Sequence, residues 1–276
     1  MPCGMRAFTA ALLLLAVAHS SLAMASPTMA PSPVVAAPAA HPVAPQRLRV
    51  DVVNVYPHDP GAFTQGLLLH DGALLESTGL EGRSSLREVE LPTGHVARRL
   101  DLSPTYFGEG LALVGNRLIQ LTWKNRVAFV YDLASFKQLG QLSYDGEGWG
   151  LCFDGQRLVR SDGTDRLYFH DPQTLARLGS VAVTLNGQPL RQLNELECVE
   201  GVVYANVWTT DSIVRIDPRT GIVTGVVDAA GLLTPAERSR ADILNGIAWD
   251  PAKGTFYITG KLWPKLFEVR FVPADH

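Results

Sequence analysis

The chain has few cysteines, few charged residues and no apolar run long enough for a membrane span. It contains three cysteines among 276 residues, and 18% of its residues are charged. Its 24 lysines and arginines nearly balance 27 aspartates and glutamates, so no basic surplus indicates nucleic acid as a partner. The apolar run Ala10–Ala18 is too short to cross a bilayer. We therefore expect neither a nucleic-acid-binding nor a membrane-embedded protein.

Motifs for metals and cofactors are also missing. The seven histidines show no metal-ligand spacing, and there is no phosphate-binding loop, nucleophile-elbow serine or H-E-x-x-H pair. We therefore expect no catalytic metal and no cofactor. Glu195 and Glu197 lie on the same face of a predicted strand, which leaves a structural ion between them as an open alternative.

The N-terminus has the pattern of an export signal. Arg6 precedes the apolar run, and Ala23-Met24-Ala25 is typical of a cleavage site. Residues 1–25 are therefore predicted to be a signal peptide. Residues 26–46, which are rich in proline and alanine, are predicted to be a disordered linker. The product would be periplasmic or secreted, with a single domain at residues 47–276.

Two cysteines remain after such cleavage. Cys152 lies one residue after Leu151 in its repeat, and Cys198 lies two residues after Leu196 in the next. Strand alternation then turns the two side chains to opposite faces of neighbouring repeats. This favours two buried free thiols, although an oxidising compartment permits a disulfide.

A repeat dominates the chain after residue 60. Each copy begins with a variable residue and a small or apolar pair, followed by alternating strand-like segments and turns. The five lead residues are Gln65, Glu109, Trp149, Asn194 and Asn245, at spacings of 44, 40, 45 and 51 residues. Short strands repeating every 40–50 residues are typical of β-propeller blades. The sequence predicts an all-β fold, a five-bladed β-propeller.

The last repeat indicates how the propeller closes. Each of the first four repeats offers four strands, whereas the fifth offers three. Leu48–Tyr56 alternates cleanly and is predicted to supply the missing strand, so that the first and last segments pair and no edge is exposed. The longest spacing contains one short inserted helix, with Thr234 as N-cap, Pro235 at the first position and helix formers over Ala236–Leu244.

Radial repetition brings the five lead residues to one central axis. Thirteen residues after the second residue of each repeat come Gly79, Trp123, Gly163 and Trp208, and Lys261 lies two residues later in the fifth repeat. Hairpins return these residues to the same rim. The predicted mouth contains the lead residues with Trp123, Trp208 and Lys261, flanked by Phe63 and Phe107.

This set of side chains indicates proton transfer. A single carboxyl group, Glu109, lies among aromatic rings, and loss of water raises the pKa of a carboxyl toward the range useful for acid–base catalysis. The amides of Gln65 and Asn194 can orient an uncharged polar substrate. Lys261 can approach a carbonyl oxygen or hold Glu109 ionised.

Seven short segments around the predicted mouth form a combination of motifs: Phe63-Thr64-Gln65-Gly66-Leu67, Phe107-Gly108-Glu109-Gly110-Leu111, Gly146-Glu147-Gly148-Trp149-Gly150, Leu193-Asn194-Glu195-Leu196-Glu197, Asn206-Val207-Trp208, Leu244-Asn245-Gly246-Ile247-Ala248 and Gly260-Lys261-Leu262-Trp263-Pro264. With these motifs the chain resembles the plant- and bacterial-type glutaminyl-peptide cyclotransferases, over essentially Val50 to Phe271. Any one of these motifs is weak, but together they are specific.

The resemblance implies a five-bladed propeller that converts N-terminal glutamine of peptides or proteins to pyroglutamate and releases ammonia. Because the histidines show no metal-ligand spacing, we expect this acid–base catalysis to be metal-independent. It assigns Glu109 as the acid–base residue. The implied substrate pocket consists of Phe63, Gln65, Phe107, Trp123, Trp149, Asn194, Trp208 and Lys261. Asn245 is placed by the repeat alone.

Three other interpretations remain open. Trp123 and Trp208 are also suited to packing between blades. A non-catalytic propeller that binds peptides through its rim shares the same fold. A metal-dependent propeller hydrolase or lactonase needs several carboxylates on the axis, whereas the predicted ring has only Glu109. The sequence offers no reason to expect more than a monomer.

Overall fold

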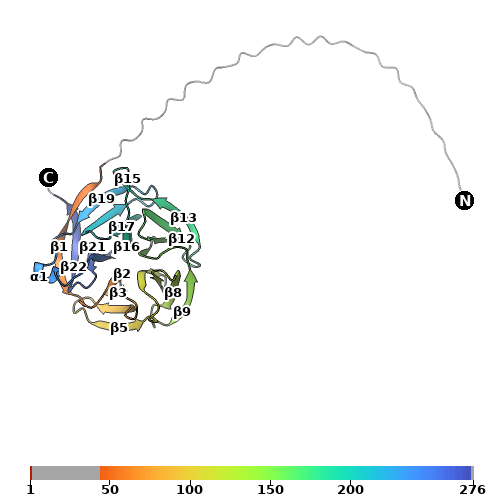
Figure 1. The fold of residues 1–276 in the computed structure, drawn as a ribbon, viewed down its shortest axis with the longest axis horizontal. Coiled ribbons are helices and arrows are strands. Elements are labelled where there is room, and N and C mark those ends of the chain that lie inside the picture. Colours follow the sequence, from red (N-terminus) through yellow and green to blue (C-terminus); the bar gives the residue numbers. More distant parts are fainter. Residues whose placement is uncertain (2–43, 275–276) are drawn as a thin grey trace, which may run out of the picture. The chain divides into compact units, whose positions relative to one another are not determined.

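The computed structural model describes Met1 and residues 44–274, and their regular secondary structure is almost entirely β-strand (Figure 1). Apart from Met1, the predicted signal peptide (1–25) lies outside the described residues. The predicted linker (26–46) lies outside them too, except for its last three residues. Strand β1 (Gln46–Pro57) begins at the last residue of that linker. Within the described part of the chain, no helix has the length and apolar character that a bilayer span requires.

Three four-stranded antiparallel sheets follow one another along the chain. The first contains β2 (Thr64–His70), β3 (Ala73–Thr78), β4 (Ser85–Glu90) and β5 (Val96–Asp101). The second contains β6 (Gly108–Val114), β7 (Arg117–Thr122), β8 (Val127–Asp132) and β9 (Gln138–Ser143). The third contains β10 (Leu151–Phe153), β11 (Leu158–Arg160), β12 (Arg166–His170) and β13 (Arg177–Ala182). A short hairpin follows, with β14 (Thr184–Leu185) and β15 (Gln188–Pro189).

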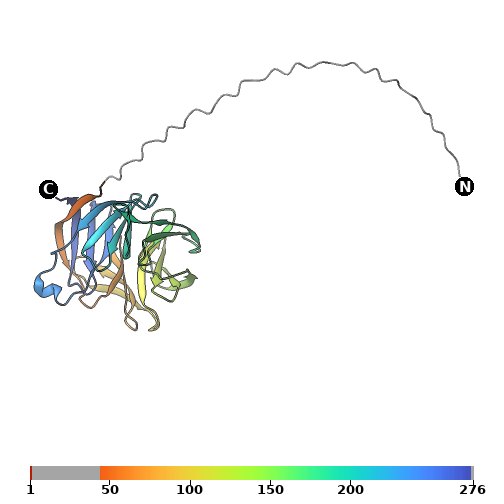
Figure 2. The same ribbon diagram turned by 45° about the horizontal axis from the view of Figure 1, so that its top comes forward.

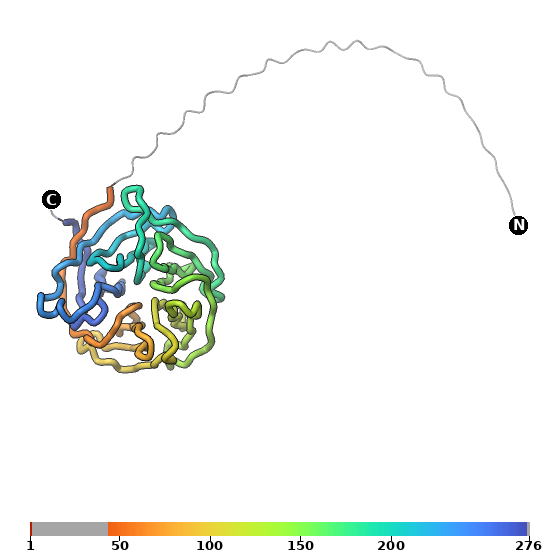
Figure 3. The backbone as a smooth tube through the Cα atoms, in the orientation of Figure 1, coloured from red at the N-terminus to blue at the C-terminus, as the bar shows by residue number. Residues whose placement is uncertain are grey.

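An eight-stranded sheet combines the first strand with the last part of the chain. One half contains β16 (Leu193–Val199), β17 (Val202–Val207), β18 (Ser212–Ile216) and β19 (Val223–Asp228). The other contains β20 (Leu244–Asp250), β21 (Thr255–Gly260), β22 (Lys265–Pro273) and β1. β1 pairs antiparallel with β22 and parallel with β19. The predicted pairing of the first and last segments is therefore confirmed, and Figure 3 shows these two strands side by side.

The hydrophobic core is divided into five layers, each between consecutive groups of four strands. Leu86 and Leu118 share the layer between the first two sheets, and Leu158 lies in the layer between the second and third. The fifth layer joins the end of the chain to its beginning, through Leu67 and Tyr257. Figures 1 and 2 show the groups arranged in chain order around a common centre. Each group therefore buries both of its apolar faces only when its two neighbours are present.

Glycines let the innermost strands meet at that centre. A Cβ on Gly110 would lie 2.5 Å from the backbone nitrogen of Leu151, and one on Gly150 would lie 2.1 Å from the carbonyl oxygen of Asn194. In the fourth repeat Glu195 replaces this glycine, and its carboxylate accepts a hydrogen bond from the backbone N–H of Ile247 at 2.8 Å. The small residue of the repeat is thus required by close backbone approach.

Cys152 in β10 and Cys198 in β16 form a disulfide, with their Cα atoms 5.5 Å apart. The prediction of two free thiols was wrong. Leu196, Cys198 and Cys152 belong to one hydrophobic layer, whereas Leu151 packs against the preceding sheet. Opposite faces of successive sheets are the faces that meet, so alternation brings these two sulfurs together.

The inserted helix is shorter than predicted. Helix α1 spans Pro235–Arg238, with Thr234 as N-cap in a capping box with Glu237. The predicted continuation to Leu244 is wrong, because the backbone N–H of Asp242 donates to the carbonyl of Lys261 and Leu244 pairs with Gly260 in the sheet. Pairing with β21 thus overrides the helix propensity of this segment.

Candidate active site

Irregularities in the inner strands turn the lead residues out of the strand ladders. In β2 the pairing passes from Thr64 directly to Gly66, so Gln65 has no partner in the register. Equivalent breaks in β6, β16 and β20 contain Glu109, Asn194 and Asn245. β-Bulges of this kind redirect side chains and often occur beside active sites. Trp149 lies just before β10 begins.

One cavity of about 330 Å³ brings all nine predicted site residues together. Its lining consists of Phe63, Gln65, Phe107, Glu109, Trp123, Trp149, Asn194, Trp208 and Lys261, with Asp242 in addition.

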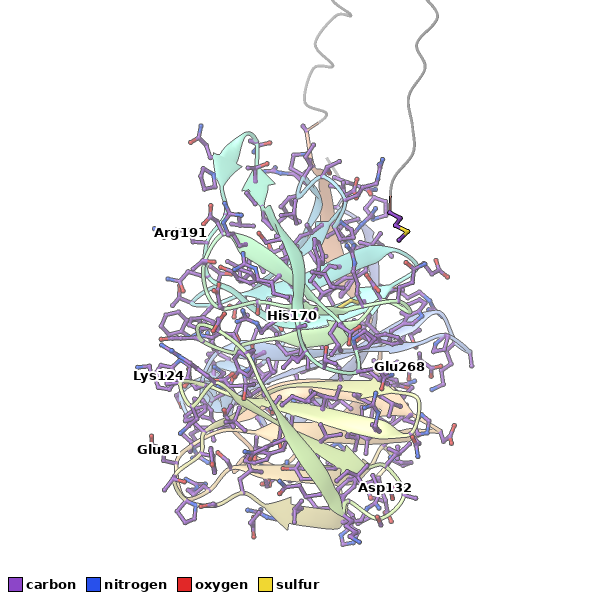
Figure 4. All side chains as sticks on the ribbon, turned by 90° about the vertical axis from the view of Figure 1, so that its right-hand side faces the viewer. Glu81, Lys124, Asp132, His170, Arg191 and Glu268 are labelled. Carbon is purple, nitrogen blue, oxygen red and sulfur yellow. A yellow bond between two sulfur atoms is a disulfide. The ribbon has the colours of Figure 1, made fainter. Side chains whose placement is uncertain are left out.

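Lys124, whose ammonium lies 3.7 Å from the centre of the Trp123 ring, is on the same side of the molecule as Glu81 and Arg191 (Figure 4). Asp132 and Glu268 are on the other side.

A chain of amides fixes the carboxyl group. The Nε2 of Gln65 donates to Oε1 of Glu109 at 3.1 Å, and the Nδ2 of Asn245 donates to Oε1 of Gln65 at 3.1 Å. Asn245 does not line the cavity but orients Gln65 from behind. Glu109 is only 4% exposed. The acid is therefore held in one orientation and is almost removed from bulk water.

Burial dominates the electrostatics of this pair of charged groups. Burial raises the pKa of Glu109 well above its usual value; the charge of Lys261 opposes this shift and that of Glu147 adds to it. Burial lowers the pKa of Lys261, against the opposing charges of Glu109 and Asp242. The pKa values of the two groups are thus shifted toward each other by burial.

Aromatic side chains form most of the cavity wall. The rings of Phe63 and Phe107 have centres 6.1 Å apart, and those of Phe107 and Trp123 are 5.5 Å apart. Trp149 and Trp208 meet edge to face at 5.6 Å. The Nζ of Lys261 lies 4.9 Å from the centre of the Phe63 ring. Trp208 is 38% exposed, so it forms the part of the wall that faces solvent.

A buried acceptor in the lining has no hydrogen-bond partner among the described residues. This acceptor is Oδ1 of Asn194, a residue that is 3% exposed. An unsatisfied buried amide oxygen costs free energy unless another molecule donates to it. A ligand with an N–H group is the natural donor in this cavity.

Two residues of the site were not identified from the sequence. Asp242 lines the cavity, and the carboxylate of Glu147 accepts hydrogen bonds from the indoles of Trp123 and Trp149. Glu147 lies in one of the segments that carry the family resemblance, but no residue pattern indicated its contacts. Within residues 44–274, no cluster of three or more His, Cys, Asp or Glu side chains is arranged to hold a metal.

The fold and the cavity define an all-β protein with a buried carboxyl group at the centre of its strand groups. The family model described as glutamine cyclotransferase matches residues 20–271, and the chain belongs to this family. It is 46% identical over 232 residues to a glutaminyl-peptide cyclotransferase of Arabidopsis thaliana, which covers 82% of this chain and 72% of that protein.

A solved structure is also similar. The crystal structure of Myxococcus xanthus glutaminyl cyclase superposes with a TM-score of 0.76 at 44% sequence identity. The match covers 84% of this chain and all of that chain. The similarity in sequence and in fold therefore extends over most of the chain.

Proposed function

We propose that this protein is a glutaminyl-peptide cyclotransferase that converts the N-terminal glutamine of peptides and proteins to pyroglutamate and releases ammonia. Family membership and both relatives support this activity. The observation that carries it is the buried Glu109 carboxyl in a cavity with the unpartnered Oδ1 of Asn194 and with Lys261. These groups match a substrate that offers an amine and a carboxamide.

The proposed reaction is intramolecular. The neutral α-amine of the substrate attacks its own side-chain carboxamide carbon, which forms a C–N bond and a five-membered ring. The bond from that carbon to the amide nitrogen then breaks, and the nitrogen leaves as ammonia. Because both reacting groups belong to one residue, the protein mainly selects the folded conformer and moves protons.

Glu109 is proposed to move the proton. Its carboxylate accepts a proton from the attacking amine and delivers it to the departing nitrogen. Gln65 already occupies Oε1 of Glu109, and no hydrogen bond to Oε2 is formed by the described residues, so Oε2 is the atom available to substrate. Lys261, Gln65 or Asn194 holds the carboxamide and stabilises the developing oxyanion. The aromatic wall surrounds the reacting groups and excludes water.

A direct assay tests the activity. Purified protein is incubated with a glutamine-initiated tripeptide, and ammonia is followed with and without a chelator. We expect release that persists under chelation, because the proposed acid–base route uses only side chains. No ammonia from several such peptides would favour a peptide-binding module. Loss of release under chelation would contradict the metal-independent route.

The role of Glu109 is tested by Glu109→Gln. The amide is nearly isosteric, so the fold is expected to be retained, as measured by circular dichroism. Turnover is expected to fall by about 100-fold or more, because the amide cannot carry the proton. Near-normal turnover in the folded variant would refute the assignment.

We also propose that the strand groups form a five-bladed β-propeller closed by β1. Five hydrophobic layers between consecutive groups, the fifth joining the last group to the first, support this architecture. Export to a periplasmic or extracellular compartment is proposed from the pattern in residues 1–25. The Cys152–Cys198 disulfide supports it, because such bonds persist mainly in oxidising compartments.

A further inference from the structure

We propose that Glu147 is a positioning residue that holds the two halves of the aromatic cavity wall together. The inference rests on the proposed function, since it concerns substrate binding in the same cavity. Oε2 of Glu147 accepts a hydrogen bond from the indole N–H of Trp123 at 2.7 Å and from that of Trp149 at 3.0 Å. A single oxygen atom therefore connects two side chains that flank different sheets, with Trp123 directly after β7 and Trp149 just before β10.

The bridge lies between two chains of ring contacts. Phe63, Phe107 and Trp123 form one chain, and Trp149 and Trp208 form the other. The Glu147 carboxylate joins the ends of the two chains. It acts from outside the cavity, because Glu147 itself is not among the lining residues. Glu147 is thus placed to fix the wall without contacting substrate.

The backbone segment that carries Glu147 is itself held in place. The guanidinium of Arg160, which is 2% exposed, donates to the backbone carbonyls of Glu147 and Asp145. The backbone N–H of Gly148 donates to the carbonyl of Trp123 at 2.9 Å, and a Cβ at this glycine would lie 2.3 Å from the Tyr144 hydroxyl. The segment that carries Glu147 therefore has little freedom to shift.

A carboxylate suits this position because an indole nitrogen only donates. Hydrogen bonds to a charged acceptor are stronger than those between neutral groups, and one oxygen has lone pairs for two donors. Removal of the acceptor would leave two half-buried donors unsatisfied and free both rings to turn. The expected consequence is weaker substrate binding rather than loss of the chemical step.

The test compares three substitutions at Glu147. Glu147→Gln removes the charge but keeps an oxygen that accepts from both indoles, whereas Glu147→Met has similar length and no comparable acceptor. Glu147→Asp keeps the charge but withdraws the acceptor by one methylene. Glu90→Gln removes an equal charge at an exposed position at the end of β4 and serves as the control. Ammonia release from a glutamine-initiated tripeptide gives kcat and KM, and near-ultraviolet circular dichroism reports the tryptophan environments.

We expect Glu90→Gln to keep KM within about twofold of the original protein. Glu147→Gln is expected to raise KM by less than Glu147→Met does, because the neutral amide oxygen still accepts from the indoles but binds them less strongly. Glu147→Met is expected to raise KM by about tenfold, with kcat within about threefold and altered tryptophan bands. If the Met variant does not fold, Glu147→Asp is expected to show an increase of KM in the same direction. The proposal is overturned if Glu147→Gln and Glu147→Met show the same KM and the same tryptophan bands. If the original protein releases no ammonia, the proposed function fails, and the dichroism comparison still decides the positioning role.

Discussion

The proton affinity of Glu109 is set by opposing neighbours. Burial raises the pKa of its carboxyl, Lys261 lowers it and Glu147 raises it further, while Gln65 contributes a neutral hydrogen bond. Asp242 raises the pKa of Lys261 and so favours its charged form. Burial raises the pKa of the Tyr144 phenol to about 12, so this group stays neutral at working pH. Of the charged neighbours of Glu109, Lys261 therefore has the largest effect on its pKa.

The pH dependence of catalysis follows from this balance. Because the carboxylate is the proton acceptor and its pKa is raised, kcat/KM is expected to fall as the pH drops through a value above the usual range for glutamate. Lys261→Met removes the opposing charge and should move this limb to higher pH. The measurement is kcat/KM against pH for both proteins with one substrate, so that titration of the substrate amine cancels. A shift to lower pH in Lys261→Met would contradict the assignment.

Spacing along the chain predicted which side chains line one cavity, but it did not predict the contacts between segments that are distant in the sequence. The repeat placed Glu109, Asn194 and Lys261 near one another, because every inner strand starts at the same end. The bulges that turn these side chains out of the ladder leave no mark in the alternation of the sequence. The contacts of Glu147 were also not predicted, because they depend on how the loops that carry Trp123 and Trp149 approach each other.

A buried ionic cluster connects the segment after β1 to the segment that carries Lys261. His58 Nδ1 lies 2.8 Å from the carbonyl oxygen of Trp263, and its Nε2 lies 3.1 Å from Oε1 of Glu76. Arg87 donates to the other oxygen of Glu76 and to Asp59. Burial alone would raise the pKa of Glu76, but His58 and Arg87 lower it to about 2. The cluster therefore holds His58 in place, and the contact of His58 with the Trp263 carbonyl oxygen fixes the segment before β22.

Acid is expected to weaken this cluster. A carboxyl whose folded-state pKa is depressed contributes stability that is present above its unfolded value near 4.5 and is lost as the pH falls toward 2. The expected loss for Glu76 is about 3 kcal/mol. Urea unfolding between pH 5 and pH 2 measures it. Glu76→Gln should be less stable at pH 5 and should show a flatter dependence; an unchanged slope would exclude this carboxyl as the cause.

The disulfide between β10 and β16 is expected to stabilise two neighbouring sheets. It links residues 46 positions apart, for which loop-closure entropy gives about 4 kcal/mol. A Cys152→Ser, Cys198→Ser double variant should therefore unfold at lower denaturant concentration than the oxidised protein. Reductant should lower the midpoint of the original protein and leave the double variant unchanged. Equal midpoints for the two proteins without reductant would contradict the prediction.

Strand positions could be predicted from the sequence because alternation and turn residues are local properties. β1, for example, contains Leu48–Tyr56, where the sequence predicts a strand. The early end of α1 could not be predicted from the sequence, because Leu244 joins β20 by pairing with Gly260 in β21, sixteen residues later. The disulfide was missed for a related reason: its formation depends on which faces of two sheets meet, and alternation within each strand does not give that.

Acidic side chains also hold the centre of the whole strand assembly. Glu195 accepts from the backbone N–H groups of Leu67 in β2 and Ile247 in β20, and Glu197 accepts from that of Trp249. Burial raises the pKa of Glu195 well above its usual value and that of Glu197 to about 8. One strand, β16, thus contacts two other groups through carboxyl groups that favour the protonated form.

Stability is therefore expected to decrease from mildly acidic to mildly alkaline pH. In this window the folded protein binds protons that the unfolded chain has released, so the free energy of unfolding falls as the pH rises from about 4.5 to 8. Tm should be lower at pH 8 than at pH 5.5 by about 5 °C or more. Calorimetry of the original protein and of Glu197→Gln tests this, with a shallower decline expected for the variant. A Tm that rises toward pH 8 would refute the account.

The seam made by β1 with β19 and β22 has a consequence for synthesis. Its strands come from opposite ends of the chain, and β22 ends at Pro273. A nascent polypeptide therefore cannot form this seam until Lys265–Pro273 has been translated and has left the ribosome. A polypeptide truncated before Lys265 would leave the strand edges of β1 and β21 that β22 covers without a partner, and would not be a smaller version of the native protein.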